Sequence, residues 1–252
     1  GGKKIRSTII FDFGKIFNLS EKKLINICAA VECIHSYSLI HDDLPCMDND
    51  IMRRGKPSTH IKFGEASAVL AGSSLLTLAF EIIVEKKYLL NFKMKNEIIK
   101  SLASCSGHTG IAGGQELDLK FENKNKKINQ IIDMQKKKTG KLFNFCLYAV
   151  GVIANKSKKD KIFLSNLGEE IGLLFQLADD FLDKKGSKYL VGKPVKKDNK
   201  QGKSTLLNLM GEKKAYLYAN NLKKKILRKL KKHGKKAKDL TSTIEFILER
   251  KF

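Results

Sequence analysis

The chain has 252 residues, and its 42% hydrophobic content supports a sizeable core in one large domain or two small ones. No apolar run reaches the roughly 18 residues of a membrane span, no signal-peptide pattern is visible, and the five Cys without a CxxC pair indicate reduced thiols in a cytosolic protein. The net charge of +23 comes mostly from Lys spread along the chain without interleaved aromatic residues, so specific nucleic-acid binding is not expected.

Apolar residues recur at helical spacing through nearly the whole chain, and no period-two alternation predicts strands. In chain order, the predicted helices cover 21–42, with Ser20 as the N-cap, then 66–84, 95–106, 128–154, 159–183, 212–233 and 239–251. The predicted loops are 49–60, 121–127, 184–204 and 233–238, with a flexible glycine-rich stretch at 107–114. This pattern predicts one all-α domain covering residues 1–252.

Two aspartate-rich segments follow apolar helical sequence. They are Asp42-Asp43-Leu44-Pro45-Cys46-Met47-Asp48 and Asp179-Asp180-Phe181-Leu182-Asp183. Asp179 and Asp183 are four residues apart and share a helix face, whereas Asp48 reaches the face of Asp42 only if Pro45 interrupts the helix with a local bulge. Crowded carboxylates require a cation, and hard oxygen ligands favour Mg²⁺. These segments predict a site that binds a diphosphate through metal ions from two sides.

Basic residues also occur in short motifs. They are Lys3 and Arg6, Arg53-Arg54-Gly55, Lys138-Thr139-Gly140, Gly192-Lys193 and Gly202-Lys203-Ser204-Thr205. Such cations neutralise the diphosphate oxygens that metal ions do not reach, and Arg adds bidentate geometry. The last motif resembles the end of a P-loop, but position 197 is Lys instead of Gly and no strand precedes it, so a nucleotide-binding P-loop is rejected.

These motifs occur in one order along the chain, together with Gly1-Gly2-Lys3-Lys4-Ile5-Arg6, Gly114-Gln115-Glu116-Leu117-Asp118-Leu119 and Phe175-Gln176-Leu177-Ala178. In this order the chain resembles the trans-polyprenyl diphosphate synthases, most closely the bacterial farnesyl diphosphate synthases. The resemblance implies an all-α barrel of helices around a deep apolar pocket, usually a homodimer. It also implies one or two helices before the Gly-Gly-Lys motif, where this sequence begins.

The resemblance assigns expected roles to individual residues. Asp42, Asp48 and Asp179 would bind three Mg²⁺ ions, with Asp43 and Asp183 in support. Arg53, Lys138 and Lys193 would hold the allylic diphosphate, which Lys203 would also contact, and Lys3, Arg6, His35 and Arg54 would hold isopentenyl diphosphate. Thr139 and Gln176 would lie along the allylic cation, and Phe175 would contact the isopentenyl chain.

Tyr37 bears on product length. It lies five residues before Asp42, roughly 7.5 Å along a helix. In the family, a bulky aromatic residue there, with Pro45 and Cys46 inserted in the first motif, accompanies C15 products. The expected reaction is the condensation of isopentenyl diphosphate with dimethylallyl or geranyl diphosphate to farnesyl diphosphate.

Three alternatives stay open from the sequence alone. The first is a geranyl or geranylgeranyl diphosphate synthase, and the second is a non-catalytic subunit of the same fold. The third is a basic nucleic-acid binder, whose affinity would fall steeply with salt.

Overall fold

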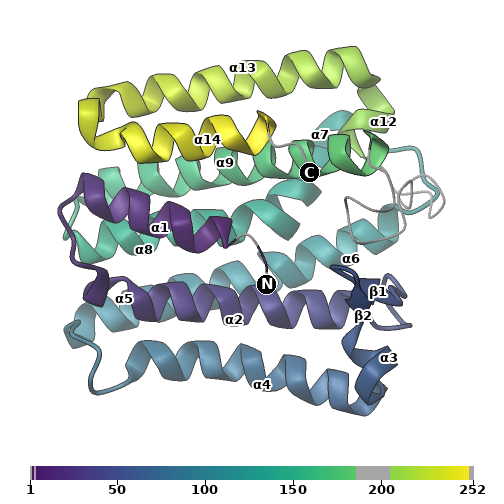
Figure 1. Cartoon of the computed structure of the whole chain (residues 1–252), viewed down its shortest axis with the longest axis horizontal. Helices are drawn as coiled ribbons and strands as arrows, with labels where there is room; N and C mark the ends of the chain where they lie inside the picture. Colours follow the sequence, from purple (N-terminus) through teal and green to yellow (C-terminus); the bar gives the residue numbers. More distant parts are fainter. Residues whose placement is uncertain (1, 3, 186–204, 250–252) are drawn as a thin grey trace.

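Helices make up almost all of the structure, which is a computed structural model and describes residue 2 and residues 4–185 and 205–249 (Figure 1). The α-helices are α1 (Ile5–Ile16), α2 (Ile25–Asp42), α3 (Thr59–Phe63), α4 (Glu65–Val84), α5 (Phe92–Ser106), α6 (Ile111–Phe121), α7 (Ile128–Gln135), α8 (Lys141–Ile153), α9 (Lys158–Lys185), α12 (Leu206–Met210), α13 (Glu212–Leu230) and α14 (Lys238–Glu249). The shorter elements are the 3₁₀ segments η1 (Glu21–Lys23) and η3 (Lys231–Ala237), the π-helical turn η2 (Lys136–Gly140) and the strands β1 (Met52–Arg53) and β2 (Lys56–Pro57).

The helices α8 and α9 pack closely against each other. Most of α8 is buried, including Phe143 and Phe145, which are fully shielded from solvent. A Cβ atom on Gly172 of α9 would lie 2.6 Å from the Cα of Gly140, and one on Gly168 would lie 2.3 Å from the carbonyl oxygen of Phe143. Only glycine allows the two backbones to approach this closely.

Other helices cover this pair. Figure 1 shows α13 and α14 along one side of α9, and α2, α4 and α5 on the opposite side of the molecule. The α1 helix packs on α8 and is tied to α14 by two contacts: the Thr243 hydroxyl donates to Asp12 at 2.8 Å, and Lys15 pairs with Asp239 at 2.6 Å. Figure 1 also shows that α2 and α9 both end toward the right-hand side, so the two acidic motifs lie at the same end of the fold.

The predicted all-α class is confirmed, and so are the helices predicted at 66–84, 95–106, 159–183, 212–233 and 239–251, within a few residues at their ends. Ser20 is the N-cap residue of the 3₁₀ turn η1, as predicted, although its side chain makes no capping hydrogen bond and α2 itself begins at Ile25. The helix predicted at 128–154 contains the π-helical turn η2 in its middle. The loop predicted at 233–238 is largely the 3₁₀ segment η3.

Four helices were not predicted, namely α1, α3, α6 and α12. The glycine-rich stretch 107–114 was expected to be flexible, but α6 begins within it at Ile111. The loop predicted at 49–60 contains a two-stranded antiparallel hairpin, in which Met52 pairs with Pro57 and Arg53 with Lys56. The predicted loop at 184–204 lies almost entirely outside the described residues.

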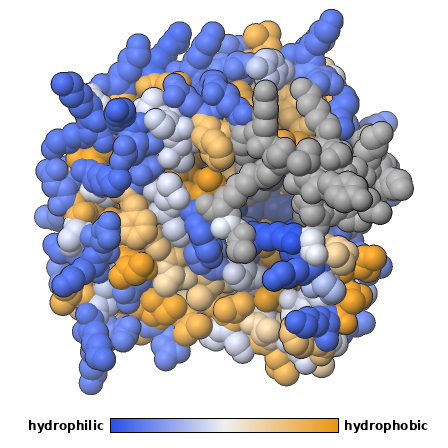
Figure 2. Space-filling model, in the orientation of Figure 1, coloured by the Kyte–Doolittle hydropathy of each residue, from blue (hydrophilic) through white to orange (hydrophobic). Residues whose placement is uncertain are grey.

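The α4 helix is unusually apolar for its exposure. Its most apolar 18-residue window has a mean hydropathy of 1.9, and only 22% of that window is buried. By length and composition it is the one helix among the described residues that could cross a membrane, whereas no apolar run long enough for a span was expected from the sequence. Its exposed apolar side chains include Val69, Leu70 and Leu78. Figure 2 shows apolar residues gathered over the lower part of the molecule, where α3 and α4 lie, and hydrophilic residues along its upper edge.

The five cysteines are free thiols. Cys28, Cys105 and Cys146 are buried, Cys33 is half-buried, and Cys46 is exposed.

Candidate active site

The first acidic motif begins where α2 ends. Asp42 is the last residue of this helix, and the chain then turns so that the Asp48 amide donates to the carbonyl oxygen of Asp42 at 2.9 Å. A second return bond joins the Asp50 amide to the carbonyl oxygen of Asp43 at 3.1 Å. The backbone of Asp48 therefore lies beside that of Asp42. The expected return takes place through a tight turn, since Pro45 cannot continue the helix, and not through a bulge within it.

The β1–β2 hairpin brings Arg53 to this turn. The two residues between its strands, Arg54 and Gly55, have φ angles of 53° and 74°, as a type I′ turn requires. The Arg53 Nε lies 3.0 Å from both carboxylate oxygens of Asp43, and one terminal nitrogen also contacts Asp43 and lies 3.5 Å from Asp50. Arg53 and Asp43, expected to bind diphosphate and metal respectively, thus form an ion pair with each other in this structure.

The Lys138-Thr139-Gly140 motif lies in η2. A π-helical turn inserts an extra residue into the helix, and such turns occur frequently at functional sites. Lys138 pairs with Asp118 of α6 at 2.5 Å, and their side chains are 22% and 10% exposed. Burial lowers the pKa of the Lys138 ammonium, but the charges of Asp118, Asp42 and Asp48 outweigh it, and the pKa is raised. Lys138 therefore stays charged beside the first acidic motif.

Gly114 allows α6 to approach η2. A Cβ atom there would lie 2.2 Å from the Lys138 backbone nitrogen and 2.7 Å from the Lys137 carbonyl carbon. A larger residue would push apart the two segments that carry Asp118 and Lys138.

A hydrogen-bonded chain connects η2 to the second acidic motif. The Thr139 hydroxyl donates to Gln176 Oε1 at 2.8 Å, and Gln176 Nε2 donates to Asp180 Oδ1 at 2.9 Å. Gln135 Nε2 donates to the other Asp180 oxygen at 3.2 Å. The Thr139 hydroxyl proton takes part in the hydrogen bond to Gln176. The lone pairs of the Thr139 oxygen are therefore available to a cation. Lys138 thus lies near the first acidic motif, and Thr139 is connected to the second.

Arg6 lies beside the aromatic pair Phe143 and Phe175, and its charge also acts on His35. The Arg6 guanidinium lies 4.8 Å from the Phe143 ring centroid and 5.7 Å from that of Phe175, and its buried Nε has no hydrogen-bond partner among the described residues. Burial lowers the pKa of Arg6, while nearby acids, including Asp179, act in the opposite direction. A buried N–H donor on a cation favours an anionic ligand at this position.

His35 should stay neutral over the whole physiological range. Burial and the charges of Arg6, Arg54 and Arg53 lower its pKa to about 2, against an ordinary value near 6.5. Between these values the unfolded chain binds a proton that the folded chain does not. The free energy of unfolding should therefore fall as the pH drops below about 6.5, by up to about 1.4 kcal/mol per pH unit from this group.

Chemical denaturation at pH 7 and pH 5 tests this expectation, together with NMR titration of the imidazole. His35→Gln should reduce the loss of stability at pH 5, whereas His108→Gln, at an exposed position, should leave it unchanged. A His35 signal that titrates near pH 6.5 would contradict the expectation.

Tyr37 is 8% exposed, and its hydroxyl lies 3.5 Å from the Ser106 carbonyl oxygen at the end of α5. Its ring contacts the His41 ring edge-on, with centroids 5.6 Å apart. The side chain is therefore fixed between α2 and α5, one turn and a half before Asp42.

Comparison with known proteins adds to this geometry. A family model described as polyprenyl synthetase matches residues 1–247. The chain belongs to the polyprenyl synthetase family. It is 41% identical over 217 residues to a farnesyl diphosphate synthase of Bacillus subtilis, which covers 84% of this chain and 73% of the relative.

Two solved structures of the family are similar throughout. An FPP/GFPP synthase from Zymomonas mobilis has a TM-score of 0.88 and 38% identity, over 98% of this chain and 84% of that one. A geranyltransferase from Helicobacter pylori, solved with magnesium and isoprenyl diphosphate, has a TM-score of 0.86 and 33% identity, over 99% and 83%. The all-α fold is therefore that of solved isoprenoid synthase structures.

Three of the predicted site residues lie outside the residues that the structure describes. They are Lys3, Lys193 and Lys203. Four polar residues in or beside the site were not predicted as site residues: Asp118, Asp180, Gln115 and Gln135. Gln115 and Asp118 belong to one of the motifs that carry the family resemblance, so the sequence could have indicated them as site residues. Gln135 precedes the Lys138-Thr139-Gly140 motif in an ordinary amphipathic stretch and could be found only from the structure.

The donor set at the two acidic motifs fits Mg²⁺. Its groups are carboxylates, the hard ligands that Mg²⁺ prefers, and Mg²⁺ usually takes one or two of these together with substrate phosphates. The described residues hold no group of three acidic, His or Cys side chains arranged to bind a metal ion. Each motif also has a buried glutamine whose Oε1 finds no hydrogen-bond partner in the described part of the chain. They are Gln115, whose Nε2 lies 3.4 Å from Asp48, and Gln135 beside Asp180. These oxygens suit a hydrated cation, whose waters donate hydrogen bonds.

Proposed function

We propose that the protein is a trans-prenyltransferase that condenses isopentenyl diphosphate with dimethylallyl or geranyl diphosphate and yields (2E,6E)-farnesyl diphosphate. The observation that carries the proposal is the position of η2 between the two acidic motifs. Lys138 there is held by the charges of Asp118, Asp42 and Asp48, and Thr139 is connected through Gln176 to Asp180. The names of the relatives support the same reaction.

The proposed site residues bind Mg²⁺ and the diphosphates of the two substrates. Asp42, Asp48, Asp179 and Asp183 would hold Mg²⁺, three ions in the full complex, which neutralises the diphosphate and favours its departure. Lys138 donates to the allylic diphosphate, and Arg53 would join it when Asp43 turns to the metal. Arg6, with its unpaired Nε, binds the diphosphate of isopentenyl diphosphate beside His35 and Arg54.

Once the allylic C–O bond ionises, the positive charge needs negative dipoles that are already oriented. Thr139 meets this need, since its hydroxyl proton is bound to Gln176 and its oxygen lone pairs are left for the cation. Asp180 fixes the orientation of the Gln176 side-chain amide, because a flipped amide would place its oxygen against the Asp180 carboxylate. The isopentenyl double bond attacks the cation, and the released diphosphate accepts the final proton.

A homodimer in the cytoplasm, with residues 1–252 as a single domain, completes the proposal. The exposed apolar side of α4 suits a second copy of the chain, because a contiguous apolar patch of this kind marks a contact surface. Free cysteines fit a reducing compartment.

Incubation of the protein with isopentenyl diphosphate, dimethylallyl diphosphate and Mg²⁺, followed by separation of the dephosphorylated products by chain length, tests the reaction. A C15 alcohol is expected. A folded protein that forms no product would contradict the proposal and favour the non-catalytic subunit.

Product length should depend on Tyr37. Tyr37→Ala removes a buried ring near the first acidic motif and should lengthen the main product to C20, because the growing tail would no longer meet the ring. The control is Tyr218→Ala, at a partly buried tyrosine of α13. An unchanged C15 product from Tyr37→Ala would show that another residue closes the pocket.

A further inference from the structure

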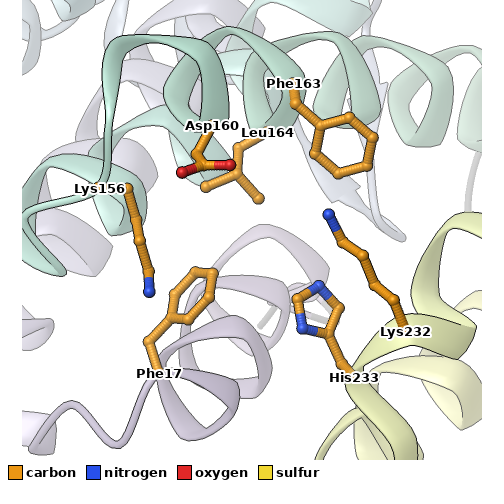
Figure 3. Close-up of a pocket in the computed structure, with 7 residues that line it drawn as sticks. All are labelled: Phe17, Lys156, Asp160, Phe163, Leu164, Lys232 and His233. Carbon is orange, nitrogen blue, oxygen red and sulfur yellow. The ribbon is translucent and has the colours of Figure 1, made fainter.

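A pocket lies at the opposite end of the fold from the acidic motifs. Here called the α1–α9 pocket, it has a volume of about 140 Å³ and is lined by Phe17, Lys156, Asp160, Phe163, Leu164, Lys232 and His233 (Figure 3). Leu164 precedes Asp179 by 15 residues on α9, or roughly 22 Å at 1.5 Å per residue. Figure 1 shows the end of α1, the start of α9 and the α13–α14 turn together on the left.

Two lysines of the pocket lie against aromatic rings. Lys156 Nζ lies 4.4 Å from the Phe17 ring centroid, and Lys232 Nζ lies 4.0 Å from that of Phe163. Neither forms an ion pair with any residue that the structure describes, although nearby Lys161 pairs with Glu97 and Lys229 with Glu170. An ammonium held on an aromatic face is positioned by the ring but keeps its charge for another anion.

The net charge of the pocket is positive once its remaining polar groups are counted. Asp160 is its one acidic side chain, and it already accepts a hydrogen bond from the Ser157 hydroxyl at 2.7 Å. The His233 ring meets Phe17 edge-on at 6.0 Å, and burial, Lys232 and Lys156 lower the pKa of His233. Two ammonium groups against one carboxylate give a net charge of +1 when His233 is neutral, so an anion would also favour its protonation.

The size of the pocket limits the ligand. A cavity of roughly 150 Å³ holds a benzene-sized molecule, so this pocket holds about six non-hydrogen atoms. A phosphate group has five, with oxygens enough for both lysines and for a protonated imidazole. Figure 3 shows Phe17 and His233 on one side of the space, Asp160 and Leu164 on the other, and the Lys232 amine beside the Phe163 ring.

We propose that the α1–α9 pocket binds a phosphate group between Lys156, Lys232 and His233. The ligand is either free phosphate or a small phosphate monoester whose apolar part lies against Phe17 and Phe163. This inference is independent of the proposed prenyl transfer, since none of these residues belongs to that site.

The test is an NMR titration of the His233 imidazole in the full chain, with its signal assigned through His233→Gln. Inorganic phosphate should raise the pKa of His233 by about half a unit or more beyond the effect of sodium chloride at equal ionic strength. The paired variant Lys156→Gln/Lys232→Gln should lose most of this rise, whereas Lys159→Gln, at an exposed position on the first turn of α9, should keep it.

Methyl phosphate, a monoester of six non-hydrogen atoms that suits this volume, distinguishes the two sources. Tighter binding than inorganic phosphate would assign the site to a phosphate monoester, and equal or weaker binding would assign it to free phosphate. A rise in the pKa of His233 that chloride reproduces, or that the paired variant retains in full, would overturn the proposal, since it would reflect general screening of a basic surface.

Discussion

Asp42→Asn and Asp179→Asn should each lower kcat by about 10²-fold or more while leaving the protein folded. Asparagine keeps the shape of aspartate but lacks the charge that holds a divalent cation, and charge stabilisation of the leaving diphosphate is the main contribution expected from this site. Both side chains are only partly buried, so the loss of their charge should not disrupt the core. Steady-state kinetics over a range of Mg²⁺ concentrations measures the effect.

The matched control is Asp133→Asn. Asp133 lies in α7, close to the site in sequence, but its side chain is 60% exposed. Among the residues that the structure describes, it pairs only with Lys137 on the same helical stretch, at 3.2 Å. Its removal should change kcat less than twofold. Full activity in Asp42→Asn or Asp179→Asn would refute the assignment of the two acidic motifs as the metal site.

Lys138→Met should reduce both stability and activity. Methionine replaces the lysine stem but removes the ammonium, so the mostly buried Asp118 carboxylate loses its ion pair with Lys138. Loss of one partner from a buried ion pair costs about 3 kcal/mol. Denaturant unfolding and steady-state kinetics on the same preparations should show both losses.

A second substitution separates the two effects. In Lys138→Met/Asp118→Asn the buried carboxylate that lost Lys138 is itself replaced by a neutral amide, so most of the stability should return. Activity should stay low, because no ammonium is left to bind the diphosphate. Recovery of activity along with stability would show that Lys138 acts only on the fold. Lys137→Met, which breaks an exposed pair, should cost less than about 1 kcal/mol.

The sequence predicted the long helices well because their apolar residues repeat at helical spacing, as in α4 and α9. It missed α6 because Gly113 and Gly114 suggest a flexible loop, although Gly114 is required by the approach of η2. It also missed α1, whose buried residues include Asp12 and Gly14 among apolar ones and so blur the pattern.

The acidic and basic motifs of the site were predictable, since each is a short run with an unusual composition. Their pairing was not predictable, because it depends on the third dimension. The ion pair between Arg53 and Asp43 arises from a type I′ turn at Arg54 and Gly55, and no local pattern indicated a hairpin there. The contact of Gln135 with Asp180 joins residues 45 positions apart.

The turn that returns Asp48 to Asp42 also carries Cys46, the one exposed thiol of the five. Burial raises the pKa of Cys28 to about 12 and that of Cys105 to about 11, and burial likewise raises the pKa of Cys33 and Cys146. Because the thiolate is the reactive form, alkylating reagents should modify Cys46 first. The chain thus has a built-in attachment point for a fluorophore or spin label within the first acidic motif, where it can report ligand binding without an engineered cysteine.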